Sequence, residues 1–121
     1  MNVIFNATQF KDLPDATRQA VEDKLAPVAR LLGEDEKLAI LDLELAEAPA
    51  EGRSSTPAKL SATLTMGKHV FHAEAVKPTP ESAADRVRSS LEHEIRKVLG
   101  KEKGMFKRGA LRVKNMLRFG S

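Results

Sequence analysis

The chain has 121 residues, of which 41% are hydrophobic and 31% are charged, and it contains no Cys, Trp or Tyr. This length fits one domain, and the hydrophobic content is that of a folded protein. The absence of Cys excludes a disulfide framework, thiol catalysis, iron–sulfur clusters and Cys-based zinc sites. No apolar run reaches the roughly 18 residues needed to cross a bilayer, and the first residues lack the pattern of a signal peptide. We therefore expect a cytoplasmic protein with no membrane partner.

The net charge of +3 conceals an uneven distribution along the chain. Residues 1–100 carry 13 Lys and Arg against 16 Asp and Glu, a balance of −3, whereas residues 101–121 carry seven against one, a balance of +6. The sequence thus predicts a mildly acidic domain over residues 1–100 and a basic C-terminal tail over residues 101–121. Tails of this kind bind polyanions, either nucleic acid or an acidic membrane surface.

The first half of the chain reads as strand, helix and strand. Apolar and polar residues alternate in both strands, and the helix carries apolar residues at i, i+4, i+7 and i+11. Pro27 removes a hydrogen bond within this helix, so we expect a kink or a break there. The predicted bounds are residues 3–7 for the first strand, Pro14 to Gly33 for the helix, and Leu38 to Leu45 for the second strand.

The second half of the chain predicts two strands joined by a tight turn, followed by a second helix. Gly67 and Lys68 suit a two-residue hairpin turn. Thr79 offers a capping hydroxyl, and Pro80 stands at the first helical position. We expect this second helix to end near Gly100. The two strands are predicted over residues 58–66 and 69–77.

These elements follow one another in the order β-α-β-β-β-α. Each layer can bury its apolar side only if both helices pack against the same face of the sheet. The predicted fold class is therefore α+β, a four-stranded sheet with two helices packed on one face, plus a basic C-terminal tail.

Motifs for catalysis or cofactor binding are not found in the sequence. The glycines of the tail follow no strand, so no phosphate-binding loop is formed. The string that starts at His93 begins like a zinc-protease motif but has Lys97 where the second His must stand. His69 and His72 are three residues apart on a strand, which directs them to opposite faces. We therefore expect no enzymatic activity, no cofactor, no metal site and no small-molecule substrate.

Basic residues on the helices form the candidate binding surface. A helical period of about 3.6 residues places Arg86, His93 and Lys97 on one outward row. Acidic side chains fall mainly on the strands behind, and this separation suits a helical face that docks on phosphates. The alternative is a solvated face of mixed charge, because acids are interleaved among the cations. Charge and geometry select Arg86 and Arg88 on the helix and Lys101, Lys103, Lys107, Arg108, Arg112 and Lys114 in the tail.

Three strings in order resemble a known family, the short ribosome hibernation factors of the hibernation-promoting factor and ribosome-associated inhibitor group. Residues 16–25 (ATRQAVEDKL) resemble the family's ALREYVEEKL, residues 71–75 (FHAEA) resemble LRAEA, and residues 91–97 (LEHEIRK) resemble LERQLRK. The resemblance covers residues 1 to about 100. Residues 79–85 keep little of the family's DMYAAID, and Pro27 replaces a usual Lys.

The resemblance implies a ribosome hibernation factor that acts in the stress response. Such a protein would bind the small ribosomal subunit on 16S rRNA, where mRNA and the A- and P-site tRNAs lie, and would inhibit translation sterically. We expect it to be a monomer when free. By position, the resemblance implies rRNA contacts for Arg18, Lys24, Arg30, Arg96 and Lys97.

Two other functions stay open at this point. One is a free-standing double-stranded-RNA-binding module, which equal affinity for any RNA duplex and for ribosomes would favour. The other is a protein–protein adaptor that uses the exposed sheet face, which binding insensitive to salt and nuclease would favour. For the tail, the alternatives are an arm that binds RNA, a basic amphipathic segment on a membrane surface, and a solubilising tail.

Overall fold

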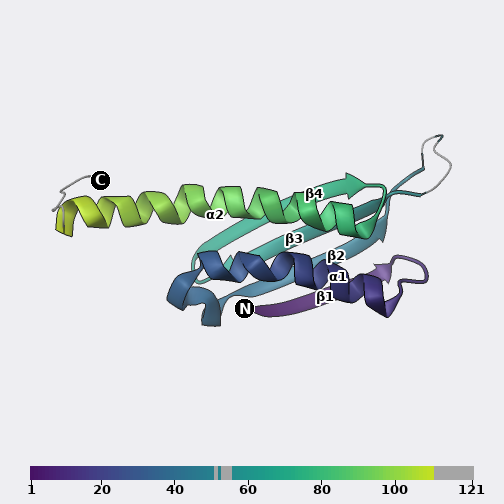
Figure 1. Cartoon of the computed structure of the whole chain (residues 1–121), viewed down its shortest axis with the longest axis horizontal. Coiled ribbons are helices and arrows are strands. Elements are labelled where there is room, and N and C mark those ends of the chain that lie inside the picture. The colour runs from purple at the N-terminus through teal and green to yellow at the C-terminus, as the bar shows by residue number, and fades with distance from the viewer. Residues whose placement is uncertain (51, 53–55, 111–121) are drawn as a thin grey trace.

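The computed structural model describes residues 1–50, 52 and 56–110 (Figure 1). Its elements follow the predicted order, and the α+β prediction is confirmed. Two 3-10 helices, η1 and η2, connect the first helix to the second strand. The elements are β1 (Asn2–Gln9), α1 (Asp15–Leu25), η1 (Ala26–Leu31), η2 (Gly33–Leu38), β2 (Ile40–Glu47), β3 (Ala58–Met66), β4 (His69–Lys77) and α2 (Pro80–Ala110).

The four strands form one mixed sheet in the order β1-β2-β3-β4. β1 runs parallel to β2, whereas β2, β3 and β4 pair antiparallel in sequence. The register places Phe5 beside Leu43, Leu43 beside Ala62, and Ala62 beside Ala73. Inward residues of all four strands therefore lie in rows across the sheet, and β1 and β4 are its edges.

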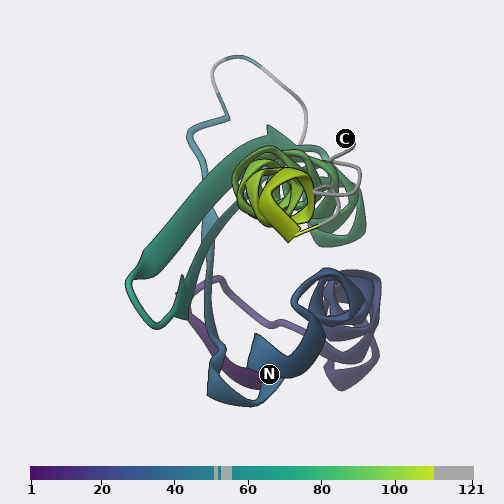
Figure 2. The ribbon, with the colours of Figure 1, turned by 90° about the vertical axis from the view of Figure 1, so that its left-hand side faces the viewer.

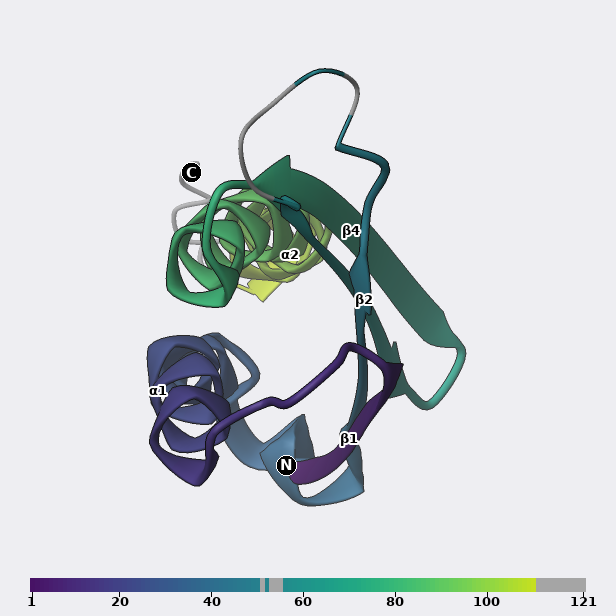
Figure 3. The same ribbon diagram turned by 90° about the vertical axis from the view of Figure 1, so that its right-hand side faces the viewer.

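Both helices cover the same face of the sheet, as Figure 2 and Figure 3 show from opposite ends of the molecule. The other face carries no helix among the described residues. Apolar side chains of the helices meet those of the strands between the two layers, and this is where the core lies. Its largest fully buried side chains are Leu25, Leu41, Leu43, Leu45, Leu60, Leu64, Leu91, Ile95, Val21 and Val28.

The break expected at Pro27 is present. The α-helix ends at Leu25, and the chain continues as 3-10 turns from Ala26. Val28 and Leu32 are still buried after the break, so the apolar face continues although the helix type changes. Gly33 has a φ of +61°, the left-handed conformation that favours glycine after a helix.

The strand bounds of the second half agree with the prediction, and the bounds of the strand before it do not. β3 and β4 begin and end where the sequence predicts. The turn between them has a φ of +59° at Gly67, as the first position of a type II′ turn requires. The predicted start of the preceding strand at Leu38 is wrong, because Leu38 ends η2 with 68% of its surface exposed and β2 starts at Ile40.

α2 begins as predicted but extends further than predicted. The Ser82 amide donates to Thr79 Oγ1 at 3.1 Å, which caps the helix just before Pro80. The expected end near Gly100 is wrong, because α2 continues to Ala110. Glycine in a helix interior costs only about 1 kcal/mol relative to alanine, and good helix formers flank Gly100. The division into residues 1–100 and 101–121 stays a prediction.

Candidate nucleic-acid interface

One row of basic residues runs along the outer side of α2. Arg86, His93 and Lys97 are spaced seven and four residues apart, so they project in one line from the helix. All three are exposed. Within the described part of the chain, neither Arg86 nor Lys97 pairs with a carboxylate. We call these three residues the α2 row, and the positive charges of Arg86 and Lys97 are free to meet an external anion.

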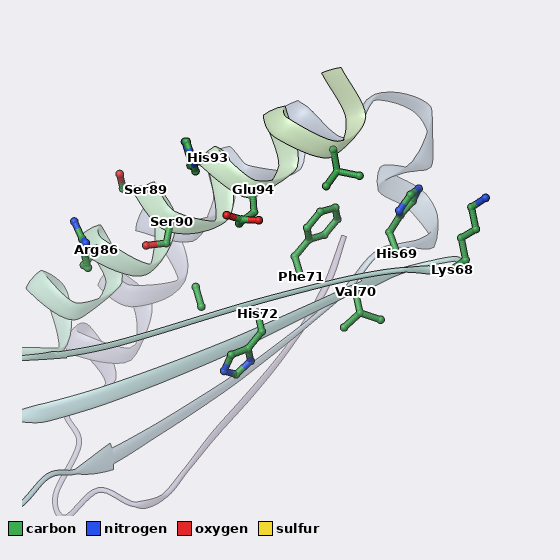
Figure 4. Close-up of a pocket in the computed structure, with 12 residues that line it drawn as sticks. Lys68, His69, Val70, Phe71, His72, Arg86, Ser89, Ser90, His93 and Glu94 are labelled. Atoms are coloured by element: carbon green, nitrogen blue, oxygen red, sulfur yellow. The ribbon is translucent and has the colours of Figure 1, made fainter. Parts of the chain in front are cut away.

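A cleft of about 700 Å³ lies between α2 and the first half of β4 (Figure 4). Ser90 and Glu94 point from the helix toward the strand, and Phe71 points back from β4. The ring of His69 stacks on that of Phe71, with the centroids 6.0 Å apart. Lys68 lines the cleft from the hairpin turn. The cleft therefore combines an apolar floor with hydroxyls and basic groups at its rim.

A second set of charges lies on the α1 side of α2, where an acid lies between two arginines. Arg88 Nη1 is 3.4 Å from Glu92 Oε2, and Arg96 Nη1 is 3.9 Å from Glu92 Oε1. The Glu92 side chain is only 14% exposed, whereas that of Arg96 is 65% exposed. Glu92 thus neutralises part of the charge of Arg88 and Arg96. Arg86 and Lys97 of the α2 row have no such carboxylate partner among the described residues.

The cations of the first helical segment are directed to different partners. Lys24 Nζ lies 3.1 Å from Asp85 Oδ1 and joins α1 to α2. The Arg18 guanidinium lies 4.6 Å from the centre of the Phe5 ring and donates a hydrogen bond to the Phe5 carbonyl oxygen at 3.4 Å. Arg30 is exposed on η1. Of the five cations carried over from the resemblance, Arg18, Lys24 and Arg96 therefore already have partners within the fold.

The uncovered face of the sheet is rich in acids, as predicted. Asp42, Glu44 and Glu74 are all exposed there. Lys59 Nζ lies 3.2 Å from Glu74 Oε2, and this hydrogen bond is the main reason why the pKa of Glu74 is lowered from its ordinary value of 4.5. The His72 ring contacts Thr63 Oγ1 through Nδ1 at 3.0 Å. Negative charge on this face and positive charge on the α2 row therefore lie on opposite sides of the molecule.

Two further properties bear on the function of the described residues. They include no group of three or more His, Asp or Glu side chains arranged to hold a metal ion. The helices in that part of the chain are also too polar or too short to cross a membrane.

Comparison with protein families identifies this arrangement. A family model described as "Sigma 54 modulation protein / S30EA ribosomal protein" matches residues 3–103. The chain belongs to this family. S30EA proteins are non-enzymatic, ribosome-binding modulators, so the resemblance to the hibernation-promoting factor group is confirmed at the level of the family.

Two solved structures share this fold with the chain. The N-terminal domain of Protein Y from Thermus thermophilus aligns with a TM-score of 0.60 and 22% identity, over 80% of this chain and 98% of that domain. A ribosomal subunit interface protein from Coxiella burnetii aligns with a TM-score of 0.64 and 15% identity, over 83% of this chain and 99% of that protein. At these identities the likeness shows the fold alone. No curated protein matches this S30EA chain.

Sequence reasoning found the α2 row of this S30EA protein and missed the cleft beside it. Lys68, Ser89 and Ser90 line the cleft but were not among the predicted contacts. The turn at Gly67 is the signal that could have placed Lys68 at a hairpin tip next to α2. The predicted contacts Arg112 and Lys114 lie outside the described residues, and the side chains of Lys101, Lys103, Lys107 and Arg108 are not described.

Proposed function

We propose that this S30EA protein is a ribosome hibernation factor that binds the small ribosomal subunit and silences translation sterically. The α2 row carries the proposal. Its side chains are exposed and project in one line, and Arg86 and Lys97 have no carboxylate partner among the described residues. A row of unpaired cations along a helix suits the phosphates of an RNA backbone.

The separation of charge supports a defined orientation on the RNA. Cations of the α2 row lie on the helical layer, whereas Asp42 and Glu44 lie on the uncovered sheet face. Phosphates attract the first surface and repel the second, so the helices face the rRNA and the sheet faces away from it.

The proposed partner is 16S rRNA in the region of the mRNA and of the A- and P-site tRNAs, in the cytoplasm under stress. The protein needs only to occupy this space, so no cofactor or turnover is involved. The family match and the cation pattern support this location. The proposed rRNA contacts are Arg18, Lys24, Arg30, Arg86, Arg88, Arg96 and Lys97, together with the tail residues Lys101, Lys103, Lys107, Arg108, Arg112 and Lys114.

Co-sedimentation with purified small subunits at rising salt tests the binding. The double variant R86E/K97E should lower the affinity at least about tenfold and reduce the slope of log K against log salt by about two. The matched control is K11E/K37E, which changes the net charge equally at exposed positions outside α2. The control should bind within about threefold of the wild type.

Two results would contradict the proposal. One is an equal loss of affinity in both double variants, which would mean that net charge matters and the α2 row does not. The other is simultaneous binding of the protein and P-site tRNA to one small subunit, which would exclude steric competition. Equal affinity for an unrelated RNA duplex would instead indicate a general double-stranded-RNA module.

A further inference from the structure

β4 is an edge strand without the proline or the bulge that would keep another strand from pairing with it. It has nine residues, it contains no proline, and its register with β3 is unbroken. The other edge is different, because the register of β1 with β2 shifts between Asn6 and Gln9. Irregularities of this kind protect an edge from pairing. β4 is therefore the edge of the sheet that is able to accept a further strand.

The main chain of β4 is also accessible along its free edge. The six consecutive residues from Lys68 to Ala73 all line the cleft beside α2. Successive side chains of a strand point to opposite faces of the sheet, so a cleft over one face would be lined by every second residue. Consecutive residues line one cleft only where the cleft runs along the edge of the strand. Figure 4 shows this alternation, with Phe71 toward α2 and with Val70 and His72 on the other side of the strand.

The sequence of β4 is self-complementary about Ala73. If two β4 strands pair antiparallel with Ala73 at the centre, His72 of each copy lies opposite Glu74 of the other, and Val70 lies opposite Val76. Val70 and Val76 are 63% and 46% exposed in one chain, and the second copy would cover them. We propose that two copies of this chain form a two-fold symmetric dimer through β4 in this register.

The hydrogen-bonding pattern of β4 permits this register, and the pairing of side chains selects it. Met66 and His69 flank a two-residue turn, so they exchange hydrogen bonds with each other. Along a strand, the N–H and C=O groups of successive residues point alternately to one neighbour and to the other. The even-numbered residues 70–76 therefore direct their main-chain groups to the free edge. A shift by two residues would place His72 opposite His72, or Glu74 opposite Glu74. Both shifts replace the two His72–Glu74 pairs with a pair of identical groups, and side-chain pairs across strands stabilise a sheet.

Dimerisation would bring the two α2 helices side by side. α2 packs on both β3 and β4, and neighbouring strands lie about 4.8 Å apart, so the two helix axes would be about 10 Å apart. The α2 rows of the two copies would then lie near each other on one outer face of the dimer and would repel each other. Salt screens this repulsion, so the dimer strengthens with salt. The proposal differs from the monomer expected from the sequence.

Sedimentation velocity of the full chain tests the dimer. The concentration should run from about 5 to 500 μM, because an interface between two edge strands is small and therefore weak. The sedimentation coefficient of the wild type should rise with concentration, and more so at high salt. H72E and E74H each place like groups opposite each other and should raise the dissociation constant at least about tenfold. The double variant H72E/E74H exchanges the two groups and should restore the dissociation constant to within about threefold of the wild-type value.

V70K provides a second variant at an exposed position, and I4K on β1 is its matched control. V70K should prevent association and I4K should leave it unchanged. In the dimer, hydrogen exchange should slow at the even-numbered amides of 70–76. A wild type that stays monomeric, or single variants that associate as it does, would overturn the proposal. RNA binding weakens with salt whereas the dimer strengthens, so failure of one proposal is distinguishable from failure of the other.

Discussion

Lys24 Nζ lies within 3.3 Å of both carboxylate oxygens of Asp85, which ties α1 to α2 across the outer side of the helical layer. The Lys24 side chain is 36% exposed and that of Asp85 is 53% exposed, so the pair stabilises the fold by at most about 1 kcal/mol. We therefore expect Asp85 to affect the proposed RNA binding more than folding, because it pairs with a cation that would otherwise meet phosphates.

We predict that Asp85→Asn raises the affinity for small subunits about threefold and leaves the urea midpoint nearly unchanged. The substitution removes a carboxylate and releases Lys24. Filter binding and urea titration measure the two effects. Asp35→Asn on η2 makes the same charge change away from the helices and should have little effect. Weaker binding of Asp85→Asn would show that Lys24 does not contact RNA.

Glu92→Gln should also strengthen binding, because Glu92 pairs with both Arg88 and Arg96. The amide keeps the shape of the side chain and removes its charge, so both guanidinium groups become available to phosphates. We expect the slope of log K against log salt to steepen by about one. Glu44→Gln on the uncovered sheet face is the control. A slope equal to that of the control would remove Arg88 and Arg96 from the proposed contacts.

Leu91→Ala should destabilise the protein by about 2–5 kcal/mol, because Leu91 is fully buried between α2 and the sheet. Urea unfolding followed by circular dichroism measures this loss. Ser89→Ala, two residues earlier and exposed, should change the stability by less than about 0.5 kcal/mol. A small effect of Leu91→Ala would place α2 further from the sheet than the structure does.

The pKa of Glu74 should lie below 4.5 and should rise when Lys59 is replaced by Met, because the hydrogen bond from Lys59 stabilises the carboxylate. A lowered pKa in the folded state stabilises the fold above the ordinary pKa, and this contribution is lost as the pH falls through the folded value. The stability difference between wild type and Lys59→Met should thus be present at neutral pH and disappear in acid. Carboxyl NMR titration checks the pKa, and an unchanged value in Lys59→Met would assign the shift to His72.

The parts of the fold that local pattern controls could be predicted from the sequence. β3 and β4 alternate strictly and are bounded by a loop and by the turn at Gly67, so their bounds agree with the prediction. Leu38 is apolar and continues the apparent alternation of β2, yet it belongs to a 3-10 turn and is exposed. A glycine after a run of helix formers predicts a helix end, but Gly100 lies inside α2. The residue type alone does not reveal this.

The candidate site also has a part that could be predicted from the sequence and a part that could not. The α2 row follows from spacing within one helix, so periodicity is sufficient to find it. The pairing of Lys24 with Asp85 joins residues 61 positions apart, and the stacking of Arg18 on Phe5 joins a helix to a strand. Such contacts depend on how the layers pack. Sequence periodicity therefore identified which residues are exposed but not which of them are already neutralised.

The parallel pairing of β1 with β2 has a consequence for folding order. β2, β3, β4 and α2 each contact an element that is next to them in the chain, so these contacts are local. α1, η1 and η2 lie between β1 and β2 in the chain. β1 is therefore the strand that is furthest in sequence from its pairing partner. Chain closure of this kind is slow, so we predict that β1 joins the sheet after the folding barrier has been crossed. Truncation of Phe5 should therefore accelerate unfolding and leave the refolding rate nearly unchanged, and the N-terminal strand sets how long the native state persists.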